Sequence, residues 1–71
     1  MLYIVNMDTI NIAVKVLKQR TKLGLSELQL SKLAGVDRDT VVNIEDGNKL
    51  PSVRTLVKIA KALGVEPRDL L

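Results

Sequence analysis

The organisation of this chain follows from one stretch, residues 26–47, whose sequence is SELQLSKLAGVDRDTVVNIEDG. Ser26 stands where a helix N-cap is expected, and Gln29 three residues later completes a capping-box pattern. Gly35 allows a tight turn, and Asp37 just after it is a second N-cap candidate. The spacing predicts two short helices joined by a turn, an arrangement whose second helix can lie in a DNA major groove.

Apolar residues before and within this stretch recur at helical spacing. From Thr9 to about Lys22, spacings of one, three and four residues predict an amphipathic helix. The residues predicted to face the core are Ile12, Ala13, Val16, Leu17 and Arg20 in this helix, Leu30, Leu33 and Ala34 in the next, and Val41 and Ile44 in the third. An arginine on an apolar stripe needs a carboxylate partner, because an unpaired buried charge is costly.

The residues after the stretch predict two more helical segments. Ser52 is a third N-cap candidate, and Gly64 marks a helix end. The apolar face predicted between them comprises Val53, Leu56, Val57, Ile59, Ala60 and Leu63. Pro67 suits a first helical position, which predicts one or two final turns in which Leu70 or Leu71 closes the core. Residues 9–71 are thus predicted to form one compact all-α domain.

Residues 1–8 are predicted to form a short N-terminal arm. Residues 2–5, LYIV, are all apolar and β-prone, which is an unusual composition for a solvated tail. The arm could pack as an edge strand on its own domain, pack on a second copy of the chain, or remain a frayed tail.

Composition limits the possible functions. The 71 residues suffice for one small domain, and the absence of cysteine and histidine removes the usual zinc ligands and thiol or Ser-His catalysis. No nucleophile–base set or phosphate loop is visible, so we expect no enzyme activity, metal or cofactor. A net charge of +3 is compatible with a nucleic-acid partner. The sequence has no apolar run of membrane-spanning length and no recognisable signal peptide, which predicts a cytoplasmic protein.

Two runs of residues carry a family resemblance. The first run comprises Leu25-Ser26, Leu30-Ser31, Ala34-Gly35-Val36-Asp37, Thr40-Val41 and Ile44-Glu45-Asp46-Gly47. The second run comprises Pro51-Ser52, Thr55-Leu56, residues 59–65 and Asp69-Leu70-Leu71. Through them residues 9–71 resemble the phage-repressor and Cro-like, XRE-type helix-turn-helix family. The resemblance implies a five-helix, lambda-repressor-like domain with its DNA-reading motif at helices 2 and 3. It also implies binding to double-stranded operator DNA as a homodimer.

The resemblance further implies roles for individual residues. The side chains expected to face base edges are Arg38, Asp39, Thr40 and Asn43, and those expected at the DNA backbone are Ser26, Asn48 and Lys49. Val42 could contact a thymine methyl group or the protein core. Arg20 and Glu45 match an arginine–glutamate pair, which we expect to be structural and to link the first helix to the third.

Some residues depart from the family pattern. Glu27 replaces a glutamine that often follows the cap of the second helix, and its carboxylate suits the helix dipole but not a nearby phosphate. Residues 37–46 are acidic, with Asp37, Asp39, Glu45 and Asp46 against Arg38, a net −3. Leu28 and Leu33 occupy positions that are often polar. We expect the N-terminal arm, through Tyr3 and Ile4, to cover one of them in cis or from a second chain.

These features favour a sequence-specific DNA-binding transcriptional regulator. We expect the third helix to enter the major groove, a dimer to occupy an inverted-repeat operator, and repression to follow because occupancy can exclude polymerase. One alternative is an antitoxin-type autoregulator that uses the same fold. Another is a module that keeps the fold but binds a protein partner without reading DNA, which Glu27 and the acidic third helix favour.

Overall fold

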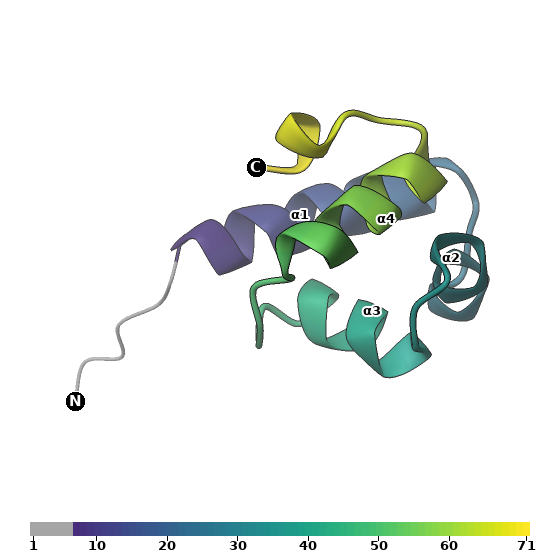
Figure 1. Cartoon of the computed structure of the whole chain (residues 1–71), viewed down its shortest axis with the longest axis horizontal. Helices are drawn as coiled ribbons and strands as arrows, with labels where there is room; N and C mark the ends of the chain where they lie inside the picture. Colours follow the sequence, from purple (N-terminus) through teal and green to yellow (C-terminus); the bar gives the residue numbers. More distant parts are fainter. Residues whose placement is uncertain (1–6) are drawn as a thin grey trace.

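In the computed structural model, residues 7–71 are described, and they form four α-helices and one short 3-10 helix (Figure 1). The α-helices are α1 (Met7–Lys22), α2 (Glu27–Ala34), α3 (Arg38–Glu45) and α4 (Val53–Leu63), and the 3-10 helix is η1 (Pro67–Leu70). No strand occurs within this range, so the described chain is all-α, as predicted. None of its helices is long and apolar enough to cross a membrane.

The two ends of the domain differ from the prediction. α1 begins at Met7 rather than Thr9, and the rest of the predicted arm, residues 1–6, lies outside the described residues. The prediction of a fifth α-helix was wrong, because η1 is a 3-10 turn of 4 residues. The backbone bonds here span three residues, from the Asp69 N–H to the Glu66 carbonyl at 2.9 Å and from the Leu71 N–H to the Arg68 carbonyl at 3.2 Å. Such tight bonding is typical of helical segments this short.

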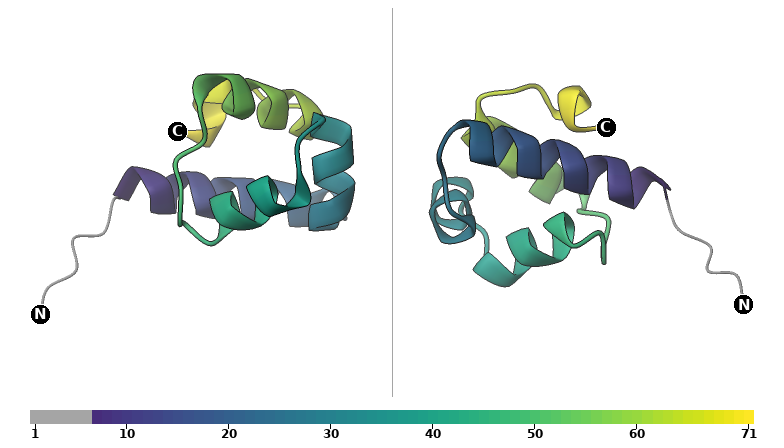
Figure 2. Two further views of the ribbon diagram at one scale, coloured as in Figure 1. Left: turned by 60° about the horizontal axis from the view of Figure 1, so that its bottom comes forward. Right: turned by 180° about the vertical axis from the view of Figure 1, so that it is seen from behind.

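The helices surround one core. α3 packs against both α1 and α2, α4 packs against α2, and η1 contacts α1 and α4 (Figure 2). Figures 1 and 2 show α2 at the end of α1 that is opposite to Met7. The motif formed by α2 and α3 therefore packs against α1 and α4.

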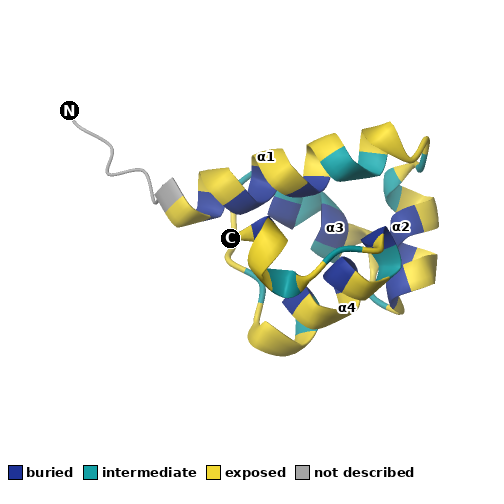
Figure 3. Ribbon diagram, turned by 90° about the horizontal axis from the view of Figure 1, so that it is seen from above, coloured by how far each residue is buried: buried dark blue, intermediate teal, exposed yellow. Residues whose placement is uncertain are grey.

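Every helix contributes buried residues to this core, and Figure 3 marks buried residues on the ribbon in dark blue. The buried cluster comprises Ile12, Val16, Leu30, Ala34, Val41, Ile44, Leu56, Ile59, Ala60, Leu63 and Leu70. Leu30 of α2 and Val41 of α3 are both 0% exposed. Because each helix of the motif places a side chain at the centre of the core, core packing sets the orientation of the motif.

Some residues predicted to face the core are exposed instead. They are Leu17 at 41%, Leu33 at 62%, Val53 at 80% and Val57 at 45% exposure. These side chains lie at the edges of apolar helix stripes, and periodicity does not reveal whether a neighbouring element covers an edge. Of the two C-terminal leucines, Leu70 closes the core at 2% exposure and Leu71 stays 60% exposed.

Candidate nucleic-acid interface

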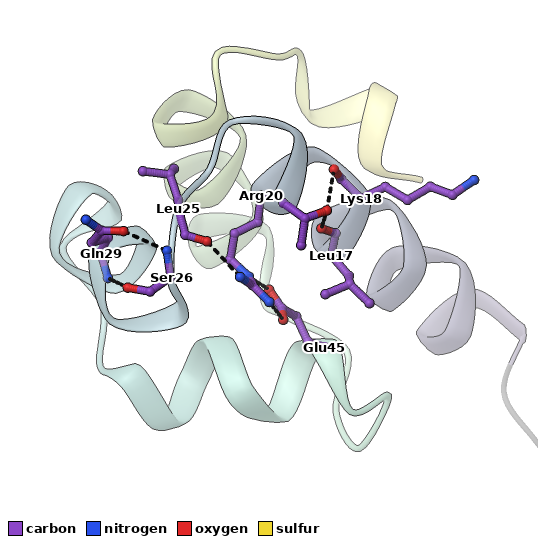
Figure 4. Close-up of polar contacts among 8 residues, drawn as sticks. Leu17, Lys18, Arg20, Leu25, Ser26, Gln29 and Glu45 are labelled. Carbon is purple, nitrogen blue, oxygen red and sulfur yellow. Dashed lines mark hydrogen bonds and ion pairs between the residues drawn. The ribbon is translucent and has the colours of Figure 1, made fainter.

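A capping box fixes the start of α2, the first helix of the motif. The Ser26 Oγ accepts a hydrogen bond from the Gln29 backbone N–H at 3.0 Å, and the Gln29 Oε1 accepts one from the Ser26 N–H at 2.7 Å (Figure 4). One bond pairs a donor in the first helical turn and the other pairs the N–H of the cap residue itself. The predicted capped start at Ser26 is confirmed.

The turn between α2 and α3 is built on Gly35, whose φ of +70° lies in the left-handed region that favours glycine. The Val36 N–H donates to the Ser31 carbonyl at 3.0 Å and so closes the C-terminal end of α2. Ser31 itself is buried, and its Oγ donates to the Leu28 carbonyl at 2.6 Å. These local bonds fix the direction in which the chain leaves α2 toward α3.

The start of α3 is held differently from the start of α2. Asp37 occupies the N-cap position, but its side chain makes no capping hydrogen bond, so the prediction that its carboxylate caps α3 was wrong. A capping carboxylate would accept a hydrogen bond from the Thr40 N–H. This N–H bonds instead to the Asp37 backbone carbonyl at 3.0 Å. α3 is anchored instead by its inner face, where Val41 is 0% and Ile44 is 2% exposed.

A two-point ion pair links α1 to α3 close to this inner face. Arg20 donates from Nε to the Glu45 Oε2 at 2.6 Å and from Nη2 to the Glu45 Oε1 at 2.8 Å (Figure 4). Its remaining nitrogen, Nη1, donates to the Leu25 carbonyl at 2.7 Å, in the loop that leads into α2. The Arg20 and Glu45 side chains are 13% and 5% exposed, so water has little access to the pair. The predicted pair is present, and it ties α1, the loop and α3 together.

The neighbouring carboxylates raise the pKa of Arg20. Hydrogen bonding to Glu45 is the main reason that the pKa of Arg20 is raised above its ordinary value. Burial acts against this rise in pKa, and the negative charges of Glu45 and Glu27 add to it. Glu27, at the start of α2, makes the smallest of these contributions to the pKa of Arg20, and Glu45 dominates.

The side chains predicted to read bases lie away from the core. Arg38 and Asp39 are exposed, and Thr40, Val42 and Asn43 are half-buried. Val42 is not among the residues packed against the core cluster, which favours its outward interpretation over the core contact. The residues predicted for the DNA backbone, Ser26, Asn48 and Lys49, are all exposed.

A small cleft connects α3 with the following loop and with α4. Its volume is about 210 Å³, and its lining comprises Thr40, Asn43, Ile44, Lys49, Leu50, Pro51, Ser52 and Thr55. The structure thus brings two predicted base-reading residues, Thr40 and Asn43, beside one predicted backbone residue, Lys49. Ser26, Arg38 and Asn48 are not part of this cleft.

Sequence reasoning missed Ser52 and Thr55 as members of this surface. Ser52 was assigned only as a helix cap, and it does cap α4, because its Oγ accepts from the Thr55 N–H at 3.1 Å. The start of α4, where the first backbone N–H groups have no acceptor in a preceding helical turn, consequently lies at the edge of the cleft that contains Lys49. The missed signal was a capped helix start directly after a basic loop.

Comparison with known proteins decides the family. A family model described as helix-turn-helix matches residues 16–70. The chain belongs to this helix-turn-helix (HTH_3, XRE-type) family. Its match runs from the middle of α1 to the end of η1, and so it includes the whole motif and the cleft.

Similar proteins carry regulatory names. The chain is 38% identical over 55 residues to the uncharacterised HTH-type transcriptional regulator YgzD of Bacillus subtilis, covering 78% of this chain and 83% of YgzD. It is 39% identical over 51 residues to an uncharacterised HTH-type transcriptional regulator of Archaeoglobus fulgidus, covering 72% of this chain and 73% of that one. The crystal structure of the restriction-modification controller protein C.AhdI from Aeromonas hydrophila superposes with a TM-score of 0.88 at 35% identity, covering 93% of this chain and all 100% of C.AhdI. The helix-turn-helix protein described here is a DNA-binding transcriptional regulator.

The motif of this helix-turn-helix regulator is acidic rather than basic. Within residues 37–46 the charges outside the Arg20–Glu45 pair are Asp37, Asp39 and Asp46 against Arg38, three negative and one positive, a net −2. Affinity for DNA depends largely on positive groups placed against phosphates. Arg38 is the one positive residue of α3, and outside this helix the nearest positive residue along the chain is Lys49.

Proposed function

We propose that this regulator is a cytoplasmic repressor that binds an inverted-repeat operator as a homodimer. In this proposal α3 enters the major groove, and occupancy of the operator excludes RNA polymerase. A two-fold symmetric dimer presents two copies of α3 to two half-sites, and the inverted repeat mirrors that symmetry. The single observation that supports this role most is the cleft in which Thr40 and Asn43 adjoin Lys49.

The outward side chains of α3 have chemistry suited to base edges. Asn43 can form two hydrogen bonds with adenine, and Arg38 can do the same with guanine. Asp39 can accept a hydrogen bond from a cytosine amino group, which gives a carboxylate a use in the groove. Thr40 and Val42 can contact a thymine methyl group. These roles predict an operator half-site in which several bases are specified.

The DNA backbone is expected to be held on both sides of the motif. Lys49 supplies a positive charge beside the cleft, and Asn48 lies next to it in the chain. The start of α4 at Ser52 can present backbone N–H groups to a phosphate, and the start of α2 at Ser26 can do so at the other end. Two groups of contacts, one at each end, would align α3 along the groove.

Selection of bound sequences from a random duplex pool tests this proposal directly. We expect enrichment of an inverted repeat, and we expect binding to weaken steeply as salt concentration rises. Lys49→Ala should reduce the log–log salt slope by roughly 0.9 if it removes one phosphate contact. Failure to bind any duplex at low salt would contradict the proposal and favour the protein-interaction module, to which the net negative charge of residues 37–46 points.

A narrower alternative comes from the likeness to C.AhdI, which extends over the full length of that controller protein. In that case the regulated genes would encode a restriction-modification system, whereas an antitoxin-type autoregulator would copurify with a toxin. The selected operator discriminates between these cases. Its position upstream of modification or nuclease genes would support the controller role, and its position upstream of a toxin gene would support the antitoxin role.

A further inference from the structure

A second, mainly apolar cleft lies where α1 begins. Its volume is about 470 Å³, and it is lined by Asp8, Asn11, Ile12, Leu50, Pro51, Val53, Leu56 and Leu71. The walls thus come from α1, from the loop before α4, from α4 itself and from the C-terminal residue. None of these residues belongs to the side chains proposed above for DNA contact.

Within the described chain, three large apolar side chains of this cleft are exposed to solvent. Leu50 is 48%, Val53 is 80% and Leu71 is 60% exposed. Burying apolar surface contributes about 25 cal/mol for each Å² removed from water, so a segment that covered these side chains would stabilise the fold. Apolar side chains grouped in this way, unlike scattered ones, indicate a binding surface.

The start of α1 lies at this cleft, and an apolar segment precedes it in the sequence. α1 begins at Met7, and Asp8, the next residue, is already part of the wall. The segment that joins α1 here has the sequence MLYIVN, in which residues 2–5 are apolar. Six extended residues span at most about 20 Å, which is ample for a site that starts one residue away.

We propose that residues 2–5 occupy this cleft in the same chain and pack against Ile12, Val53 and Leu71. The volume suits this occupant, since a cavity of about 150 Å³ is already enough for a small apolar group, and the cleft offers about 470 Å³. Occupancy in cis joins the N-terminal segment to the loop before α4 and to the C-terminus. The two clefts share Leu50 and Pro51, but Ile12, Val53 and Leu71 are not among the residues proposed to contact DNA.

The length of the N-terminal segment favours this cleft over the exposed apolar side chains of α2. α1 has 16 residues, which corresponds to a length of roughly 24 Å. Leu28 and Leu33 of α2 are 47% and 62% exposed, but α2 lies at the far end of α1 (Figure 1). A segment of six residues attached at Met7 falls short of them in its own chain, so their coverage would need a second copy.

Tyr3 provides the test, because it is the only aromatic residue of the chain. Quenching of its fluorescence by acrylamide in the full-length protein measures how accessible the segment is. We expect Tyr3 to be several-fold less quenchable than free N-acetyltyrosinamide, and we expect this protection to be the same across a hundredfold range of protein concentration.

A matched pair of substitutions localises the protection. Val53→Asp places a carboxylate in the cleft, in the first turn of α4. Negative charge there suits the helix dipole, so we expect the fold to be retained. This substitution should make Tyr3 as quenchable as N-acetyltyrosinamide. Val14→Asp, at a valine that is 44% exposed outside the cleft, should leave the quenching unchanged. Circular dichroism checks that both variants remain helical.

Several results would overturn the proposal. Tyr3 that is freely quenched in the unmodified protein would show that the segment is not buried. Protection that is lost on dilution would assign the segment to a second copy, and release by Val14→Asp but not Val53→Asp would place it along the side of α1.

Stability provides an independent measurement. A chain that starts at Met7 should have an unfolding equilibrium constant raised roughly tenfold or more, the factor expected when one buried apolar side chain is lost. Val53→Asp should then have little further effect in the shortened chain, because the two changes remove the same contact. Additive effects of the two changes on the unfolding constant would contradict the proposal.

Discussion

The two faces of α3 differ sharply in the contacts that their side chains make with the rest of the protein. The inner face is fixed by core packing of Val41 and Ile44, and Glu45 is held by two hydrogen bonds to Arg20. The outward side of the same eight residues carries Arg38 and Asp39, which are exposed and make none of the hydrogen bonds or ion pairs observed between side chains of the described chain. If the proposed DNA contacts are made by the outward side, stability and recognition reside on separate sides of one short helix, and they should respond separately to substitution.

The largest expected effect is on the inner side. Glu45→Ala removes the partner of a largely buried arginine, and breaking such a pair typically costs about 3–5 kcal/mol. Because the pair retains some exposure, we expect unfolding free energy to fall by more than about 2 kcal/mol. Chemical denaturation followed by circular dichroism measures this loss. Asp46→Ala, at the neighbouring exposed carboxylate, is the matched control and should change stability little; equal midpoints for the two variants would refute the structural role of the pair.

On the outward side, Asn43→Ala should affect binding rather than folding. A lost two-point contact to a base is expected to weaken operator binding by about 1–3 kcal/mol. Unfolding free energy should stay within about 0.5 kcal/mol of the parent value, since the side chain is only half-buried. Titration of the selected operator by fluorescence anisotropy measures the affinity. Asn11→Ala on α1 serves as a control, and an equal loss of affinity there would show that the effect is not local to α3.

A smaller effect is expected from Asp39→Asn. Removing this negative charge reduces repulsion from phosphates, so binding to generic duplex DNA should strengthen by less than about 1 kcal/mol at low salt. Discrimination between the operator and generic DNA should fall at the same time if Asp39 accepts a hydrogen bond from a cytosine. An equal gain in Asp46→Asn would assign the effect to net charge instead of to this position.

The sequence predicted the motif well because its signals are local. Ser26 and Gln29 are three residues apart, and Gly35 needs only its own backbone conformation to end α2. Arg20 and Glu45 are distant in sequence. The apolar stripe showed only that Arg20 requires a carboxylate partner, and the family resemblance identified that partner as Glu45. The prediction that the Asp37 side chain caps α3 was wrong for an equally local reason. The Thr40 N–H bonds to the Asp37 backbone carbonyl instead of the Asp37 carboxylate.

What the sequence alone determined is therefore the four α-helices, the caps at Ser26 and Ser52 and most of the buried residues, all of which depend on hydrogen bonds and periodicity within a few residues. The tertiary structure decided which edges of those helices are covered, leaving Leu17, Leu33 and Val53 exposed. It also decided that Asn43, Lys49 and Ser52 share one cleft. Both outcomes depend on how separate elements pack against each other, and helical periodicity carries no information about a neighbour that lies far away in the sequence.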